Sequence, residues 1–165
     1  MNPSISTIIL MGVSGCGKTT IGKLLAERLD CVFIESDEYH SADDIRKMSS
    51  GIPLTDQDRW PWLFRLNKLL KDAQDGSKPV VLACSALKQE YRDILSAGLL
   101  NFFYVYLRGD YELIFSRMQQ RRHFMGAHML ASQFEILEAP ADALVIDIKL
   151  PPHQIVDTIL EKLFK

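Results

Sequence analysis

The sequence has few cysteines, and their spacing suits neither a disulfide framework nor a cysteine metal site. Its 165 residues include three cysteines, which are far apart and form no Cys-x-x-Cys pair. Small disulfide scaffolds and zinc sites need paired or closely spaced cysteines, so the sequence predicts neither. Unpaired cysteines fit a reducing compartment, and we therefore expect a cytoplasmic protein.

A basic excess and long apolar runs are also missing. The formal net charge is −2, whereas a broad nucleic-acid surface needs a basic stripe, so we expect no nucleic-acid partner. The apolar run at residues 8–11 is too short to span a membrane. The N-terminus has neither a basic region nor a small-residue cleavage site. We expect no membrane partner.

The composition that remains is that of a globular protein, and residues 1–165 are predicted to form one domain. Short apolar runs alternate with segments of helical periodicity. Strands are predicted at 5–11, 32–34, 80–84, 102–107 and 144–148. Helices are predicted at 18–29, 41–48, about 55–75, 88–95, 111–121, 129–137 and 155–164. This α/β alternation indicates a parallel sheet with helices on both faces, which is a three-layer sandwich.

Ligands of such sheets bind at the carboxyl ends of the strands. Four segments of this chain directly follow predicted strands, at residues 12–19, 35–40, 84–88 and 108–110. We therefore expect these segments to form one rim, and candidate functional residues are sought there.

Residues 12–19 read Gly-Val-Ser-Gly-Cys-Gly-Lys-Thr and match the phosphate-binding P-loop pattern at every fixed position, between a predicted strand and a predicted helix. In a P-loop, backbone N–H groups and the helix N-terminus hold phosphates. The alternative is a glycine-rich turn that binds no ligand. Lys18 is predicted to reach the transferred phosphate, and Thr19 and Glu35 to hold Mg²⁺. The predicted ATP-binding residues are Gly12, Val13, Ser14, Gly15, Cys16, Gly17, Lys18, Thr19 and Thr20.

Motifs of other nucleotide-binding classes are absent. The sequence has no Asp-x-x-Gly, and Asn67-Lys68 is not followed by the aspartate of a guanine-reading motif. The strand predicted at 80–84 ends in Ser85 rather than in the acidic pair of large ATPases. These absences favour a small-molecule kinase. A nucleotide-binding regulatory protein without turnover stays as the alternative.

Candidate acceptor-binding residues lie on the same rim. Asp37 follows the second strand, where a carboxylate can orient an attacking hydroxyl. The alternative is that Asp37 caps a helix and has no catalytic role. His40 could bind a hydroxyl-rich substrate or be structural. Arg59 could bind an anion or pair with nearby carboxylates. Lys88 and Arg92 are four residues apart on a predicted helix and suit an anionic acceptor, or a solvated basic face.

A cluster of arginines precedes an irregular stretch of sequence. Arg117, Arg121 and Arg122 end a predicted helix, and the helical pattern then breaks. Small kinases use a mobile lid that brings arginines to the transferring phosphoryl group. We therefore predict a lid at about 117–130 with Arg117 and Arg121 as catalytic residues. Plain surface charge is the alternative.

Together these motifs resemble the gluconate kinase family, a group of shikimate-kinase-like small P-loop kinases. The matching blocks are residues 12–19, 36–40, 47–48, 51–59, 61–63, 84–88, 91–93, 123–125, 132–135 and 137–138. The resemblance implies a P-loop NTPase fold with a five-stranded parallel sheet. It also implies ATP- and Mg²⁺-dependent phosphorylation of D-gluconate to 6-phospho-D-gluconate, by a homodimer.

The same resemblance implies roles for single residues. It assigns the acceptor hydroxyl to Asp37, and gluconate's other groups to His40, Arg59, Lys88, Arg92 and His123. The sequence departs from the family in three places. Glu35 stands where aspartate is usual, the segment between Arg121 and His123 is one residue shorter, and Gly126 replaces a frequent proline. Shikimate and nucleoside monophosphates stay as alternative acceptors.

Overall fold

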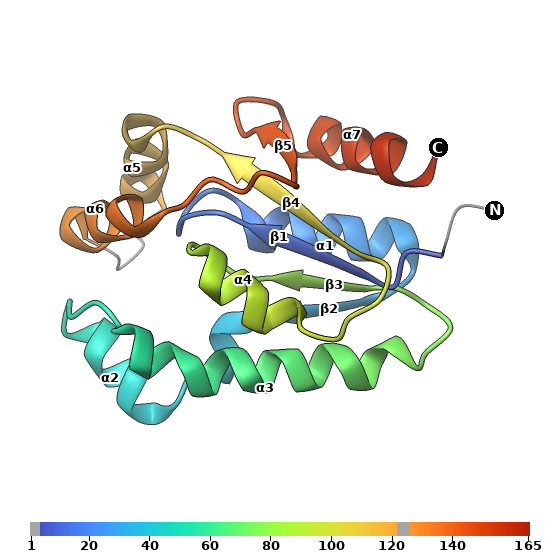
Figure 1. Ribbon diagram of the computed structural model, residues 1–165. Coiled ribbons are helices and arrows are strands. Elements are labelled where there is room, and N and C mark those ends of the chain that lie inside the picture. Colours follow the sequence, from blue (N-terminus) through green and yellow to red (C-terminus); the bar gives the residue numbers. More distant parts are fainter. Residues whose placement is uncertain (1–3, 122–125) are drawn as a thin grey trace.

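The computed structural model describes residues 4–121 and 126–165 (Figure 1). Its strands are β1 (Thr7–Met11), β2 (Val32–Glu35), β3 (Val80–Ala83), β4 (Phe102–Arg108) and β5 (Leu144–Asp147). Its helices are α1 (Lys18–Leu29), α2 (Ala42–Ser49), α3 (Asp56–Gln74), α4 (Gln89–Ser96), α5 (Tyr111–Gln120), α6 (Ala127–Ile136) and α7 (Pro152–Phe164). A 3₁₀ turn, η1 (Ser36–Tyr39), follows β2.

The strands form one five-stranded parallel sheet in the order β2-β3-β1-β4-β5. Every residue of β1 is buried, as an apolar strand with neighbours on both sides requires. Helix α1 packs on α7 and α3 packs on α4, and the two pairs cover opposite faces of the sheet (Figure 1). The predicted parallel sheet with helices on both faces is confirmed.

The core lies between the sheet and these helices. Ile9 of β1, Leu82 of β3, Leu25 of α1, Leu66 of α3 and Ile159 of α7 have no exposed surface. Burying one such side chain contributes about 1.5–3 kcal/mol to folding. Because both faces are sealed in this way, ligands have access only at the edges and ends of the sheet.

The strand order places the loop after β1 at the point where the chain reverses direction across the sheet. Strand β1 lies between β3 and β4, so the crossovers on its two sides run in opposite directions. A crevice forms at the carboxyl end of the sheet at such a point. Helices α2 and α6 flank this end of the sheet, at the left of Figure 1.

Local structure differs from the expectation at several places. The turn η1 was not predicted, because four residues show no periodicity. Helix α4 begins at Gln89, and Lys88 is its extended N-cap rather than its first residue. Helix α6 begins at Ala127, two residues earlier than expected. None of the helices in the described part of the chain is long and apolar enough to cross a membrane.

Candidate active site

The loop between β1 and α1 has the backbone of a phosphate cradle. Gly12, Gly15 and Gly17 have φ angles of 145°, 80° and 104°, a region that residues with a side chain rarely adopt. A Cβ on Gly12 would also lie 2.8 Å from the carbonyl oxygen of Leu107. No side chain among the described residues caps α1, and its first turn holds no acidic residue. The helix N-terminus is therefore suited to an anion.

A cavity of about 350 Å³ lies against this loop, and we call it the nucleotide cavity. Lys18 Nζ donates hydrogen bonds to the carbonyl oxygens of Gly12 and Val13, both at 2.9 Å. Thr19 Oγ1 donates to Glu35 Oε2 at 2.5 Å, which brings the two predicted metal ligands together. The lining residues are Ser14, Gly15, Gly17, Lys18, Thr19, Thr20, Glu35, Asp37, Met118 and Arg121.

The other three predicted ATP-binding residues do not line this cavity. Gly12, Val13 and Cys16 are the buried residues of the loop. Cys16 Sγ lies under Gly12, where an added Cβ would meet it at 2.8 Å. These three residues therefore support the shape of the loop from its buried side.

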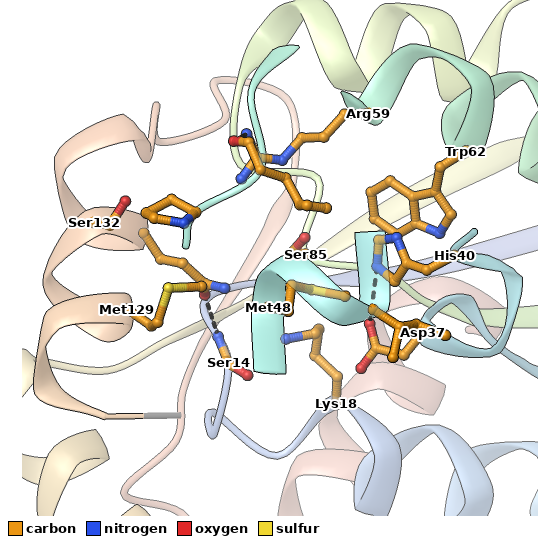
Figure 2. A pocket seen from close by; sticks show the side chains of 14 residues that line it. Ser14, Lys18, Asp37, His40, Met48, Arg59, Trp62, Ser85, Met129 and Ser132 are labelled. Atoms are coloured by element: carbon orange, nitrogen blue, oxygen red, sulfur yellow. Dashed lines mark hydrogen bonds and ion pairs between the residues drawn. The ribbon is translucent and has the colours of Figure 1, made fainter. Parts of the chain in front are cut away.

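A second cavity of about 290 Å³ adjoins the first, and we call it the acceptor cavity (Figure 2). Ser14, Lys18 and Asp37 line both cavities. The other residues lining it are His40, Ile45, Met48, Pro53, Leu54, Arg59, Trp62, Ser85, Met129, Ser132 and Gln133. Of the four predicted rim segments, 12–19, 35–40 and 84–88 each contribute to this lining, and 108–110 does not.

Asp37 is placed by α3. Trp62 Nε1 of α3 donates a hydrogen bond of 2.8 Å to the carbonyl oxygen of Ser36, which fixes the turn that carries Asp37. The His40 ring stacks on Trp62 with a centroid separation of 4.3 Å. Its Nε2 atom lies 3.7 Å from Asp37 Oδ1. The His40 imidazole lowers the pKa of the Asp37 carboxyl, and the charge of Lys18 adds to this effect.

His40 has a hydrogen-bonding atom that no described residue satisfies. Its side chain is 5 % exposed, and its buried Nδ1 atom has no partner in the described part of the chain. Buried polar atoms are rarely left without a partner. Because His40 lines the acceptor cavity, a polar group of a ligand can supply that partner.

Arg59 lines the acceptor cavity, whereas Lys88 does not. Arg59 Nη1 donates to the carbonyl oxygen of Leu54 at 2.6 Å and to the Tyr91 hydroxyl oxygen at 3.0 Å. Lys88 Nζ instead pairs with Asp56 Oδ1 at 3.0 Å. The contact of Lys88 with the acceptor therefore stays a prediction that this geometry does not support. As the extended N-cap of α4, Lys88 does not share a helical face with the residue four positions later.

Arg92 is 2 % exposed and lines a separate surface cavity, so its contact with the acceptor also stays a prediction without support from this geometry. Its guanidinium donates to the carbonyl oxygens of Ala86 at 2.7 Å, Leu87 at 3.1 Å and Glu138 at 2.9 Å. It thereby joins the loop after β3 to the segment after α6. In this arrangement the guanidinium is used within the protein.

The two predicted catalytic arginines differ in position. Arg121 lines the nucleotide cavity, directly after the end of α5. Arg117 lines neither of the two cavities, and its Nη2 donates to the carbonyl oxygen of Ile148 at 2.9 Å. The predicted substrate residue His123 lies outside the described residues, as does Arg122.

Several cavity residues had no predicted role. Trp62, Ser132 and Gln133 belong to sequence blocks shared with the gluconate kinase family, and that membership was the available signal. Ile45 gave no signal, because an apolar residue of a short helix is not distinguishable from a core residue in the sequence.

Comparisons with known proteins agree with this geometry. A sequence model of the shikimate kinase family matches residues 14–164. The thermosensitive gluconokinase of Escherichia coli (strain K12) is 48 % identical, over 86 % of this chain and 79 % of the relative. The thermoresistant gluconokinase of the same strain is 41 % identical, over 95 % and 93 %.

A solved structure agrees as well. The crystal structure of a gluconokinase from Sinorhizobium meliloti 1021 superposes with a TM-score of 0.86 at 41 % identity, covering 96 % of this chain and 91 % of that one. The sequence matches, the shared fold and the phosphate loop beside a second cavity lead to one conclusion. The chain belongs to the gluconokinase family of P-loop kinases.

Proposed function

We propose that the protein transfers the γ-phosphoryl group of ATP to D-gluconate and forms 6-phospho-D-gluconate. The observation that carries this proposal is that Ser14, Lys18 and Asp37 line both cavities. A phosphate donor bound on one side and an acceptor on the other therefore meet at these residues. The gluconokinase relatives support gluconate as the acceptor.

The acceptor cavity suits a molecule with a carboxylate at one end and a hydroxyl at the other. Figure 2 shows Arg59 and Lys18 on opposite sides of the pocket. Arg59 can bind the carboxylate, which holds the negative end of gluconate away from the ATP phosphates. The far hydroxyl then lies near Asp37, and His40 Nδ1 can meet another hydroxyl.

Positioning and electrostatics carry the reaction in this arrangement. The acceptor oxygen forms a bond to the γ-phosphorus while the bond to the oxygen bridging to the β-phosphate breaks, and ADP leaves. An aspartate carboxyl is ionised at neutral pH even at its ordinary pKa, and the pKa of Asp37 is lower still, so Asp37 can orient the hydroxyl and accept its proton. Lys18 and Arg121 balance the negative charge, and Arg117 is less well placed to do so.

Mg²⁺ binding is proposed at Thr19 and Glu35. The Thr19 hydroxyl and the Glu35 carboxylate lie in contact beside the phosphate loop. Both are hard oxygen ligands of the kind that Mg²⁺ prefers. The ion, when bound, neutralises phosphate charge. Chelation by EDTA is expected to stop ADP release and added Mg²⁺ to restore it.

Three further properties are proposed. The lid at about 117–130 rests on the arginine cluster that precedes an irregular stretch of sequence, and the homodimer rests on the family resemblance. The cytoplasmic location rests on three cysteines that form no disulfide with one another. Light scattering of the purified protein tests the dimer, and a monomer would contradict it.

ADP release over a panel of acceptors tests the proposed activity. We expect ATP turnover with D-gluconate, and turnover at background level with shikimate or nucleoside monophosphates. Lys18→Ala is expected to lower the rate by about 100-fold or more, because it removes a cation at the transferring phosphate. Lys23→Ala, an exposed change on the same helix, is the matched control.

Other results of the panel would contradict the proposal. Turnover with shikimate or a nucleoside monophosphate in place of gluconate would mean a different acceptor. Absence of ADP release with every acceptor of the panel would favour a nucleotide-binding regulatory protein without turnover.

A further inference from the structure

The side chain of Gln133 joins α6 to the phosphate loop. Its Oε1 atom accepts a hydrogen bond of 2.6 Å from the backbone N–H of Ser14, 119 residues away in the sequence. The helix that carries it is fixed on both sides of this residue. Leu130 is fully buried, and Phe134 packs edge to face on Tyr111 at 5.7 Å. The packing of α6 therefore sets the position of Gln133, which is not a freely moving surface residue.

The contact lies on the acceptor side of the loop. Gln133 lines the acceptor cavity together with Met129 and Ser132 of the same helix, and it does not line the nucleotide cavity. Ser14 borders both. Gly15 and Gly17 border only the nucleotide cavity. Gln133 thus leaves the phosphate-facing part of the loop open while it occupies the edge next to the acceptor.

The bond to Ser14 also fixes which end of the carboxamide is available. A backbone N–H can only donate, so the atom that meets it is the amide oxygen and the remaining end is the Nε2 group with two N–H donors. Nε2 has no hydrogen-bond partner within residues 4–121 and 126–165. The acceptor cavity, which Lys18 and Asp37 also line, therefore gains a donor of fixed orientation at Ser14.

We propose that Gln133 binds the hydroxyl end of the acceptor through Nε2 while Oε1 stays on Ser14. The proposal rests on the proposed function and adds a specificity residue to the same site. Asp37 accepts hydrogen bonds and Gln133 Nε2 donates them, so the cavity offers both kinds of partner to the hydroxyl groups of a polyol chain. Nucleotide binding does not use this contact, because the nucleotide cavity excludes Gln133.

Two substitutions separate the proposed contact from a purely structural one. Gln133→Glu keeps the length and an oxygen that can accept from Ser14 N–H, but it has no donor at neutral pH. Gln133→Met keeps the length and removes both polar ends. If Gln133 only held the loop, the glutamate variant would raise the KM for gluconate only through its added negative charge, and that increase would shrink at high salt, whereas the loss of a donor persists.

Steady-state kinetics and nucleotide binding without gluconate are measured for both variants. We expect the KM for gluconate to rise about 10-fold in each, the effect of losing one hydrogen bond. The dissociation constant of ATP for Gln133→Met is expected to stay within about twofold. Glu135→Ala is the control, because Glu135 is exposed on the same helix and lines neither of the two cavities.

Three outcomes would overturn the inference. An unchanged KM for gluconate in Gln133→Glu at high salt, with an impaired Gln133→Met, would leave Gln133 a structural role only. Weaker ATP binding with an unchanged KM for gluconate would make it a nucleotide contact. Absence of gluconate turnover by the unaltered protein would overturn the proposed function as well, whereas the first two outcomes leave that function intact.

Discussion

At the scale of single residues, the position of Asp37 depends on Trp62 of helix α3 and on His40. The Trp62 indole holds the backbone of Ser36 and stacks on His40, and His40 lies beside the carboxylate. Glycines and Lys18 were predictable because a phosphate loop is defined within eight consecutive positions. The Trp62 contact was not, because it joins residues 26 apart through the packing of α3.

Replacement of Asp37 by asparagine tests its role in orienting the hydroxyl. The amide keeps the size of the side chain but cannot take the proton. We therefore expect kcat to fall by about 100-fold or more, while the dissociation constant of ATP changes little. Steady-state kinetics and nucleotide titration measure both. Glu38→Gln, at the exposed next position, is the control, and a change only in the KM for gluconate would make Asp37 a binding residue instead.

The role given to Arg92 predicts a loss of stability and not of substrate binding. Arg92→Ala leaves three carbonyl oxygens without their donor. We expect the free energy of unfolding in urea to fall by about 2–4 kcal/mol, with the KM for gluconate nearly unchanged in the folded protein. Arg28→Ala, which breaks an exposed ion pair, is expected to cost under about 1 kcal/mol. Unchanged stability with a raised KM for gluconate would restore the original expectation for Arg92.

At the scale of elements, helix starts were predictable where the capping side chain is local. Helices were predicted from residue 41 and from about residue 55, and the hydroxyl groups of Ser41 and Thr55 accept from the backbone N–H of Asp44 and Asp58 there. The Asp58 carboxylate in turn accepts from Thr55 N–H at 2.9 Å and pairs with Lys47 of α2. This pairing joins α2 to α3, and no local pattern indicated it.

The junction between α2 and α3 is expected to weaken in acid. The Lys47 ammonium group and the Thr55 N–H lower the pKa of Asp58 from 3.8 to about 2. A lowered pKa means that this stabilisation is complete above about pH 4 and is lost as the pH falls toward 2. We therefore expect Asp58→Asn to lower Tm at pH 7 and the difference from the unaltered protein to narrow below pH 4. A difference in Tm that is constant with pH would contradict the assigned interaction.

At the scale of the whole molecule, the sheet brings distant segments to one place. The order β2-β3-β1-β4-β5 sets the phosphate loop next to the ends of β2 and β3, which supply Asp37 and Ser85. The rule for parallel sheets predicted this meeting from the alternation of strands and helices. It could not predict that α6 reaches across to Ser14, because that contact depends on how Leu130 and Phe134 pack.

The position of the new phosphate on gluconate tests the central claim most directly. The proposed geometry holds the carboxylate at Arg59 and presents the far hydroxyl to the γ-phosphate. The proton-coupled ³¹P NMR spectrum of the product made from ATP, Mg²⁺ and D-gluconate is therefore expected to show a phosphate ester split into a triplet by the two protons of carbon 6. A doublet from a secondary carbon, or no ester signal at all, would contradict the account.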